Sequence, residues 1–295
     1  MRAHRPTGEF PRHLETLYAR FPFDRSFDDD PISAVRALVR DRRTAEVAGV
    51  FASTLAIGNT TAIRRAIAEL GRRADGDVAR LVDPAWASER GRRLRGFRHR
   101  WIRGDQLEYL AGTLSEFYRR APSLEPVFLG GLEDGGFARG LDALAQVLRG
   151  GARRGPSARP PPGYQALFPT PLGAGRSPAK RLTLFVRWMV RPRYPDLGVW
   201  SRVPTGELRV PLDQHVHWIA YHLGLTARRT RSWRAVEEVT EALRRIDPID
   251  PVRYDFVLCH TGISGDCPKE RDLAVCGPCS VRPDCLLWRG VRGAA

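Results

Sequence analysis

The sequence predicts an all-α protein. Apolar residues recur at helical spacing in most segments that lie between glycine- and proline-rich stretches. The strict alternation of apolar and polar residues that marks a half-buried strand is nowhere sustained. No internal repeat is present, so we expect separate helices of different length and not a repetitive array.

The first half of the chain carries clear signals for the beginning and end of helices. Thr44–Ile57 is apolar almost all round, which predicts a buried helix. Gly58 and Asn59 should end it, and Thr60 should cap the next helix. Asp28–Asp30 is expected to cap the helix that follows it. The helices expected here are His13–Phe21, Ile32–Arg40, Thr44–Ile57, Thr60–Leu70, Asp105–Arg120 and Phe137–Leu148.

The second half is predicted to be helical as well. Ser177 is expected to cap a long helix that Pro178 opens, since proline is tolerated in the first turn. Residues 192–204 are predicted to be a loop-like insertion. The remaining helices expected are 211–223 and 231–245, and residues 251–260 lead into the cysteine-rich segment.

The length of 295 residues predicts two domains, because it exceeds a typical single core. Residues 151–162 are the clearest linker, rich in glycine, proline and arginine with almost no apolar residue. We therefore expect a helical-bundle domain at 31–150, and a second domain that combines 1–30 with 163–295.

The charge of the chain favours a polyanionic partner. The net charge is +15 and the pI about 10.6, which indicates nucleic acid ahead of an anionic membrane. The N-terminal residues contain no apolar signal core, and no apolar run approaches a membrane span. We expect a soluble cytoplasmic protein.

Lysine is rare in this arginine-rich chain. Only two of the 48 basic residues are lysine, Lys180 and Lys269. Arginine does not deprotonate at usable pH and cannot act as an amine nucleophile, so a retained lysine is a candidate for that role. Chance retention is the alternative explanation.

All five cysteines lie between positions 259 and 285. The last four form the pattern Cys267-x8-Cys276-x2-Cys279-x5-Cys285, and clustered thiolates suit a soft metal centre. A [4Fe–4S] cluster takes four thiolates and is the preferred interpretation. A structural zinc site is the second, and unliganded or disulfide-bonded cysteine is the third. Cys259 lies in an apolar run and is expected to be a buried free thiol.

Three further patterns suit binding or catalysis, and each also has an ordinary structural explanation. Gly173 and Gly175 precede a helix, where backbone amides can approach a phosphate or simply form a turn. Asp213 stands at the start of a helix, as a catalytic carboxylate or an N-cap. Arg228 and Arg229 are expected to contact phosphates if DNA binds, and otherwise to form a solvated cationic turn.

The order of these motifs resembles that of the helix-hairpin-helix DNA glycosylase superfamily, which includes endonuclease III and the adenine DNA glycosylase. More closely, the segments RLTLFVRWMVR at 181–191, PDLGVW at 195–200 and PLDQHVHWIAYHLGLT at 211–226 resemble a largely uncharacterised bacterial family on this fold. That resemblance covers most of the chain and implies no activity of its own. The positions that match the superfamily are Gly173, Gly175 and Arg176 of the hairpin; Asp213, His215 and Val216; His260 and Gly262; and the four clustered cysteines, with a first gap two residues longer than in those enzymes.

The resemblance implies specific roles for several residues. The hairpin would hold the DNA backbone, Asp213 would serve catalysis, and the turn at Asn59 would enter the duplex beside a flipped base. Ser177 occupies the position of the lyase lysine of endonuclease III, as in the adenine glycosylase. The sequence separation between Ser177 and Asp213 is about twice the one usual between the corresponding positions of these enzymes. In the archaeal 8-oxoguanine glycosylase branch the separation between the nucleophilic lysine and the aspartate is longer. When the chain is aligned with that branch, Lys180 resembles the nucleophilic lysine.

These observations together predict a DNA repair glycosylase that acts on damaged duplex DNA. Asp213 and Lys180 are its expected catalytic residues, and Asn59, Gly173, Gly175, Arg176, Ser177, Arg228 and Arg229 its expected DNA contacts. Trp101 and Trp218 are candidates for stacking on the flipped base. A non-catalytic iron–sulfur DNA-binding protein on the same fold is the alternative. A zinc-stapled protein that binds or modifies RNA is a third class.

Overall fold

The computed structural model describes residues 7–151, 159–172 and 177–289. Helix accounts for 59% of it and strand for 1%, so the mostly helical class predicted from the sequence is confirmed. The chain forms two compact units. The central unit is Asp24–Pro204, and the terminal unit combines Met1–Phe23 with Thr205–Ala295. None of the helices in the described ranges has both the length and the hydropathy of a membrane span.

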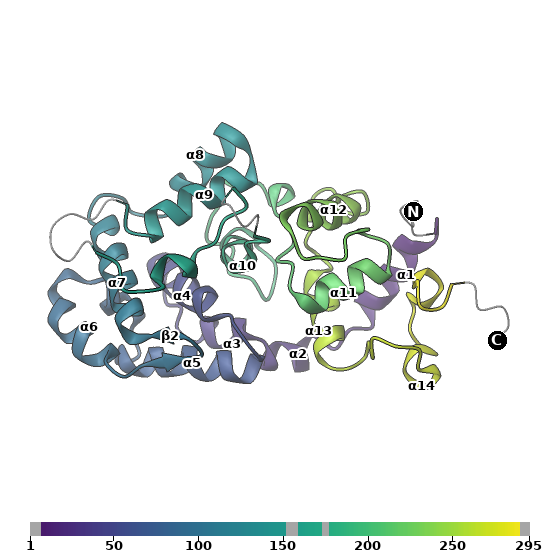
Figure 1. The fold of residues 1–295 in the computed structure, drawn as a ribbon, viewed down its shortest axis with the longest axis horizontal. Coiled ribbons are helices and arrows are strands. Elements are labelled where there is room, and N and C mark those ends of the chain that lie inside the picture. The colour runs from purple at the N-terminus through teal and green to yellow at the C-terminus, as the bar shows by residue number, and fades with distance from the viewer. Residues whose placement is uncertain (1–6, 152–158, 173–176, 290–295) are drawn as a thin grey trace. The chain divides into compact units, whose positions relative to one another are not determined.

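Helices also make up nearly all of the central unit (Figure 1). Its elements are α2 (Phe23–Asp29), which begins at the boundary, α3 (Pro31–Arg36), α4 (Arg42–Leu55), α5 (Thr60–Arg73), η1 (Val78–Val82), η2 (Pro84–Trp86), α6 (Ala87–Leu94), β1 (Arg98–His99), β2 (Ile102–Arg103), α7 (Gly104–Tyr118), α8 (Glu125–Gly135), α9 (Phe137–Leu148), η4 (Tyr164–Leu167) and α10 (Lys180–Val190). The expected range of α9 agrees with the structure at both ends. The short α2, α6, α8 and the β1–β2 hairpin were not anticipated, because their periodicity is too short or too weak.

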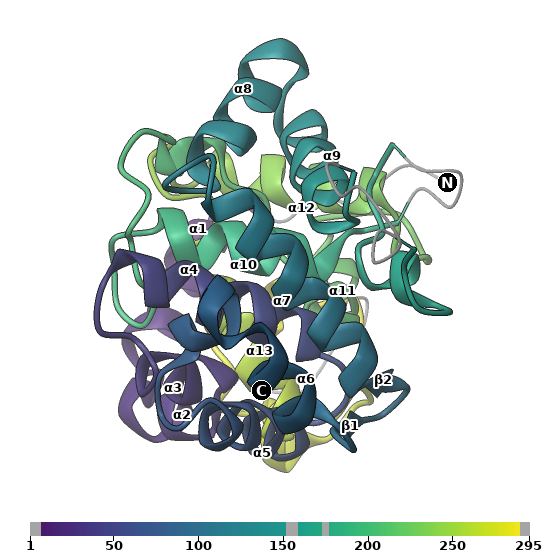
Figure 2. The ribbon, with the colours of Figure 1, turned by 90° about the vertical axis from the view of Figure 1, so that its left-hand side faces the viewer.

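Helix α4 lies at the centre of this unit's core. All but the first two of its residues are buried, as its apolar composition predicts. It packs against α10, and Figure 2 shows the two helices side by side. Because α10 follows the expected linker in sequence, this packing joins the chain on both sides of the linker into one unit.

Glu46 is a buried carboxylate in the middle of α4, with 1% of its surface exposed. It accepts hydrogen bonds from the Tyr118 hydroxyl at 2.9 Å, the Leu124 backbone N–H at 3.0 Å and the Trp200 indole N–H at 2.7 Å. The Ser123 hydroxyl donates to it as well. A buried charge is tolerated only when it is well hydrogen-bonded, so these donors hold the loop around Trp200 against the bundle.

The observed units therefore do not coincide with the expected domain boundaries. Residues 163–204 were expected to form part of the second domain, but they lie in the central unit with 31–150. The packing of α10 on α4 and the Trp200–Glu46 hydrogen bond are the physical reason. Most of the expected linker at 151–162 lies outside the described residues.

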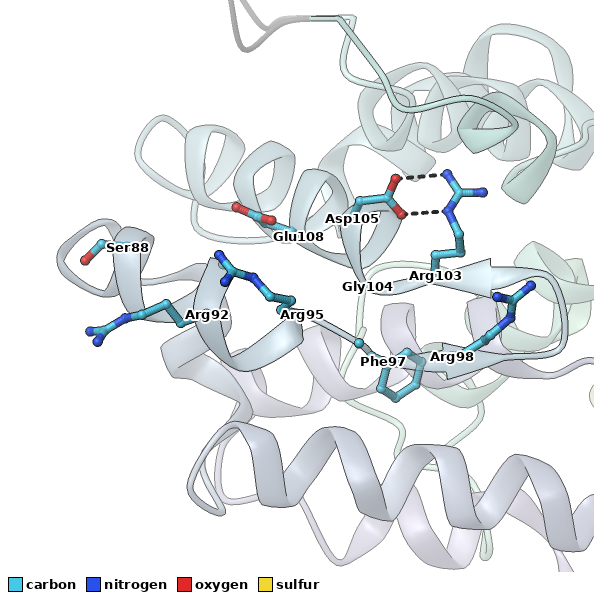
Figure 3. A pocket seen from close by; sticks show the side chains of 11 residues that line it. Ser88, Arg92, Arg95, Phe97, Arg98, Arg103, Gly104, Asp105 and Glu108 are labelled. Atoms are coloured by element: carbon cyan, nitrogen blue, oxygen red, sulfur yellow. Dashed lines mark hydrogen bonds and ion pairs between the residues drawn. The ribbon is translucent and has the colours of Figure 1, made fainter.

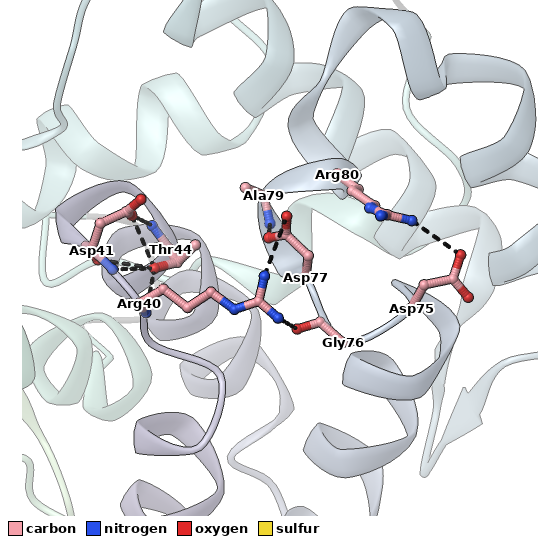
Figure 4. A network of polar contacts seen from close by, with 8 residues as sticks. All are labelled: Arg40, Asp41, Thr44, Asp75, Gly76, Asp77, Ala79 and Arg80. Carbon is pink, nitrogen blue, oxygen red and sulfur yellow. Dashed lines mark hydrogen bonds and ion pairs between the residues drawn. The ribbon is translucent and has the colours of Figure 1, made fainter.

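A polar network ties the start of α4 to the turn that follows α5 (Figure 4). The Asp41 carboxylate accepts from the Thr44 backbone N–H at 2.8 Å, and the Thr44 hydroxyl accepts from the Asp41 N–H, which forms a capping box. The Arg40 guanidinium donates to the Gly76 carbonyl at 2.9 Å and lies 3.7 Å from the Asp77 carboxylate. Local caps and one long side chain thus set the orientation of α4.

Two of the expected caps need correction. Asn59, rather than Thr60, caps α5, and its side chain accepts from the Ala62 N–H at 2.8 Å. Helix α10 begins at Lys180 rather than at Pro178, because Ala179 adopts a left-handed conformation with φ of 49°. Ser177 still accepts a hydrogen bond, from the Ala179 N–H at 3.0 Å.

The terminal unit brings the two ends of the chain together. It consists of α1 (Phe10–Ala19), η5 (Thr205–Glu207), α11 (Gln214–His222), α12 (Trp233–Arg244), α13 (Asp255–Ile263), α14 (Leu273–Cys276) and η6 (Arg282–Asp284). The buried Asp284 carboxylate accepts from the Thr7 N–H at 2.9 Å and contacts His13 Nδ1 at 2.7 Å. The Arg253 guanidinium bonds to Glu15 at 2.6 Å. These contacts anchor α1 on the C-terminal segment.

Candidate functional site

The four clustered cysteines line one cavity of the terminal unit. Its volume is about 50 Å³, and apolar and aromatic side chains form most of the remaining wall. Cys276 ends α14, the Cys279 N–H donates to the Cys276 carbonyl at 3.2 Å, and Cys285 directly follows η6. The Cys267 N–H donates to the Thr261 carbonyl of α13 at 3.0 Å. Short turns therefore bring four half-buried thiols to one place.

The protonation of these thiols reflects their burial and their proximity. Burial is the main cause that raises the pKa of Cys267, Cys279 and Cys285. Neighbouring thiolates raise the pKa further: Cys276 acts on all three, and Cys267 acts on Cys279 and Cys285. Four thiols that influence one another in this way form one electrostatically coupled group.

Two buried nitrogen atoms at the same cavity, His222 Nδ1 and Trp288 Nε1, have no hydrogen-bond partner within the described residues. A hydrogen bond from the Trp218 indole to the Cys267 thiol partly offsets the rise in the pKa of that thiol. Unpartnered buried polar atoms are rare and call for an explanation. Such groups suit the sulfur atoms of a thiolate-bound cluster, which accept hydrogen bonds. The donor set thus fits a thiolate-ligated centre, although no group of three or more His, Cys, Asp or Glu side chains positioned to hold a metal ion occurs in the described ranges.

Cys259 lies apart from this cavity. It belongs to α13, and its thiol donates to Asp213 Oδ2 at 3.4 Å. It is half-buried, so the expectation of a fully buried thiol is only partly met. The fifth cysteine is therefore a neighbour of the candidate catalytic carboxylate.

Asp213 caps the N-terminus of α11. Its Oδ1 atom accepts from the His215 N–H at 2.8 Å and from the Val216 N–H at 2.9 Å. These bonds fix the rotamer of the carboxylate, and the helix dipole favours negative charge at this end. The N-cap explanation is therefore correct, and Oδ2 accepts a hydrogen bond from the Cys259 thiol.

Close packing of α11 on α13 holds the Asp213 end of α11 in place. His215 Nδ1 lies 2.8 Å from the Gly262 carbonyl oxygen. A Cβ atom added at Gly262 would lie only 2.8 Å from His215 Cβ, so no larger residue fits without moving the helices. His260, also on α13, is buried and stacks on Phe256 at 4.3 Å between ring centroids. His215 thus packs the interface between α11 and α13.

In the central unit, the exposed turn at Asn59 lies against the tip of the β1–β2 hairpin. His99 Nε2 on β1 lies 3.0 Å from the Ile57 carbonyl oxygen, and His99 is buried. Gly58 has φ of 104°, and the Arg100 guanidinium occupies the space where a Cβ would stand. The hairpin therefore places a cation, Arg100, next to the exposed Asn59.

An exposed aromatic ring and further cations lie nearby. Trp101 follows Arg100 in the hairpin turn and is 43% exposed. The Arg181 guanidinium lies 5.8 Å from its ring centroid. Burial lowers the pKa of Arg181 to about 10, so this group stays charged at neutral pH. Half-buried Lys180 precedes it at the start of α10. Aromatic and basic groups in this combination are typical of nucleic-acid contacts.

The structure places the other residues that were expected to contact DNA in different environments. Gly173, Gly175 and Arg176 lie outside the described residues. Arg228 is paired with Glu238 at 2.8 Å, which satisfies part of its charge. Arg229 is exposed. Trp218 lines the cysteine cavity, so its assignment to a flipped base is not supported by its position.

Two features of the central unit have no periodic signal in the sequence. The β1–β2 hairpin is only two residues long on each side, too short for alternation to stand out. A pocket lined by arginine side chains lies at its base. The concentration of arginine between positions 90 and 103 was the available signal.

The comparisons with known proteins give one match. Residues 30–264 match a family described as protein of unknown function (DUF2400), and the four clustered cysteines lie beyond the matched segment. No curated protein and no solved structure matches the chain. Since the match covers well over half of the sequence, the chain belongs to the DUF2400 family.

Proposed function

We propose that this protein is a DNA glycosylase that excises a damaged base, with an accompanying AP-lyase step. The observation that carries the proposal is the geometry of Asp213. Two backbone N–H groups hold this carboxylate at the head of α11, in the same unit as the four-cysteine cavity. A carboxylate so fixed is suited to stabilise the oxocarbenium-like sugar that forms when a glycosidic bond breaks.

Asp213 and Lys180 have separate roles in the proposed chemistry. The bond between the damaged base and C1′ breaks, and the base leaves with the bonding electrons and takes up a proton. Asp213 stabilises the positive charge that develops on the sugar. The neutral Lys180 amine forms a bond to C1′ and loses a proton. The C1′–O4′ bond then breaks, O4′ takes up a proton, and C1′ is left doubly bonded to Nζ as a Schiff base that permits strand cleavage.

The central unit supplies the proposed DNA contacts around the base. Asn59 enters the duplex while Trp101 stacks on an exposed base, with Arg100 and Arg181 close to the phosphates. This assignment rests on the shared location of the Asn59 turn and the hairpin tip. Base flipping needs a group that fills the vacated stack, and stacking on an aromatic side chain contributes about 1–3 kcal/mol per base.

A [4Fe–4S] cluster held by Cys267, Cys276, Cys279 and Cys285 is part of the proposal. When bound, it would cross-link the C-terminal segment around α14 and η6. Zinc is the lesser alternative. Iron and acid-labile sulfide analysis of the purified protein tests this assignment, and zinc without iron or sulfide would exclude it.

A second function, a non-catalytic DNA-binding protein on the same scaffold, is favoured by one contact. The Cys259 thiol donates to Asp213 Oδ2, so both oxygens of the carboxylate have partners within the terminal unit. Ser177, which stands in place of the lyase lysine, also favours the non-catalytic function. In this alternative Asp213 only caps α11.

Borohydride trapping and base release distinguish the two functions. Duplexes carrying an abasic site, 8-oxoguanine, uracil or an oxidised pyrimidine are incubated with the protein. We expect a covalent adduct that is lost in Lys180→Gln and retained in Lys269→Gln, since Lys269 is exposed and lies outside the proposed chemistry. Asp213→Asn should abolish base release. Base release at the wild-type rate in Asp213→Asn would refute the catalytic assignment.

A further inference from the structure

A second pocket with a different lining lies in the central unit. Its volume is about 560 Å³, within the range of about 300–1,000 Å³ that is usual for small-molecule sites. The last turn of α6, the β1–β2 hairpin and the first turns of α7 form its wall. Figure 3 shows Arg92 at one end of the pocket and two strand arginines, Arg98 and Arg103, at the other.

The two strand arginines face each other directly. Arg98 on β1 is the register partner of Arg103 on β2, so their side chains project from the same face of the hairpin. Like charges in directly opposed positions destabilise a pair of strands. Asp105 relieves this repulsion in part, since it forms a two-point ion pair with Arg103 at 2.9 and 3.1 Å. The Arg98 charge is left uncompensated.

Three charged side chains of the pocket have no ionic partner within the described residues. Arg95, at the end of α6, and Arg98 make no salt bridge with an acidic side chain there, and both are exposed. Glu108 lines the α7 side and likewise lacks a cationic partner in this part of the chain. The pocket therefore offers two free guanidinium groups and one free carboxylate at its wall.

We propose that this pocket binds a nucleotide unit, with Arg98 on its phosphate. Arg95 and Glu108, which lie toward the other end of the pocket (Figure 3), contact acceptor and donor groups of its sugar or base. Guanidinium groups bind phosphate oxygens through charge-assisted hydrogen bonds in a geometry that lysine does not offer. A carboxylate accepts from hydroxyl and amino donors and repels a bare anion. The combination of the three thus favours a nucleotide over inorganic phosphate.

The nucleotide has two possible sources, a free mononucleotide or one residue of a DNA strand. The hairpin that carries Arg98 at its base carries Arg100 and Trp101 at its tip, beside the Asn59 turn. A DNA strand that contacts the tip is therefore close enough to supply the nucleotide for the pocket. The inference does not depend on base excision, because an inactive protein would bind in the same way.

The test compares two variants with the same loss of charge. Arg95→Gln/Arg98→Gln removes the two free guanidinium groups of the pocket. The control, Arg25→Gln/Arg139→Gln, removes two exposed arginines of the same unit that do not line the pocket. Isothermal titration measures binding of 2′-deoxyadenosine 5′-monophosphate and of inorganic phosphate, and fluorescence anisotropy follows a 20-base-pair duplex at several salt concentrations.

A free nucleotide as the ligand predicts that the mononucleotide binds more tightly than phosphate. Its affinity should fall at least tenfold in the pocket variant and stay unchanged in the control. A DNA strand as the ligand predicts that the slope of log K against log[salt] falls by about one in the pocket variant alone, because about 0.9 counterions are released per phosphate contact and Arg98 makes one such contact. If neither effect occurs, or if the control behaves like the pocket variant, the proposal is overturned.

Discussion

Gly262→Ala tests the close packing of α11 on α13 that positions Asp213. A Cβ at position 262 would lie 2.8 Å from His215 Cβ and 3.2 Å from His215 Nδ1. His215 Cβ is attached to the backbone, so it cannot rotate away, and the helices must separate by several tenths of an ångström. The new methyl group thus acts against the main chain of α11 and not against a flexible side chain.

The expected magnitude follows from three contributions. Replacing glycine by alanine in a helix favours folding by about 1 kcal/mol. Overpacking costs typically 1–3 kcal/mol, and loss of the hydrogen bond between His215 Nδ1 and the Gly262 carbonyl costs about 1 kcal/mol more. We therefore expect a net loss of roughly 2 kcal/mol in the free energy of unfolding of the terminal unit.

Urea unfolding followed by circular dichroism measures this change. Gly8→Ala is the matched control, because it lies in the same unit and a Cβ there meets nothing within 4 Å. The control should stay within about 0.5 kcal/mol of the wild type. A Gly262→Ala protein as stable as the wild type, or more stable, would show that α11 and α13 are not in the contact described. If Asp213 is catalytic, base release should also fall by more than the unfolded fraction explains.

Three further changes test other parts of the structure. Glu46→Ala should destabilise the central unit by at least about 3 kcal/mol, since it leaves the buried Trp200 and backbone donors unpaired; Glu46→Gln should cost less in the same urea titration, and equal costs would contradict the network. Asp41→Ala removes the capping box with Thr44 and should cost about 1 kcal/mol; a thermal melt that does not change would argue against the cap. Burial lowers the pKa of His222 below its usual value near 6.5, so the folded form resists protonation. Its contribution to stability is present above pH 6.5 and is lost as the pH falls through the folded-state pKa. The decrease in stability between pH 7.5 and 5 should therefore be smaller in His222→Gln, and an unchanged profile would exclude this residue as a cause.

Local sequence patterns anticipated much of the helical structure. The range of α9, the buried character of α4 and the Asp213 cap were readable because they depend on neighbours within one or two turns. Shorter elements such as α6 and the β1–β2 hairpin were not, since a few residues carry too little periodicity. The left-handed Ala179, which delays the start of α10, also has no signal in the amino-acid types nearby.

The candidate sites show the same difference between features set by neighbouring residues and features set by tertiary packing. The spacing of the four cysteines was enough to predict that they lie together, because short turns limit how far apart they can be. Their shared cavity with Trp218 and Trp288 depends on packing between α11 and the C-terminal turns, which spacing does not specify. In the same way, charge composition predicts a polyanionic partner but does not locate the pocket where Arg98 opposes Arg103.

Helix type, cysteine clustering and caps such as Asp213 could thus be read from the chain alone, since each arises from hydrogen bonds and sterics among near neighbours. The domain boundary could not. It depends on Glu46, which binds Trp200 across 154 positions of sequence. Such a contact forms only when α4, α10 and the loop after it are already packed, because a buried carboxylate is stable only with all its donors in place. Tertiary packing therefore places residues 163–204 with the central unit and sets which side chains meet at each site.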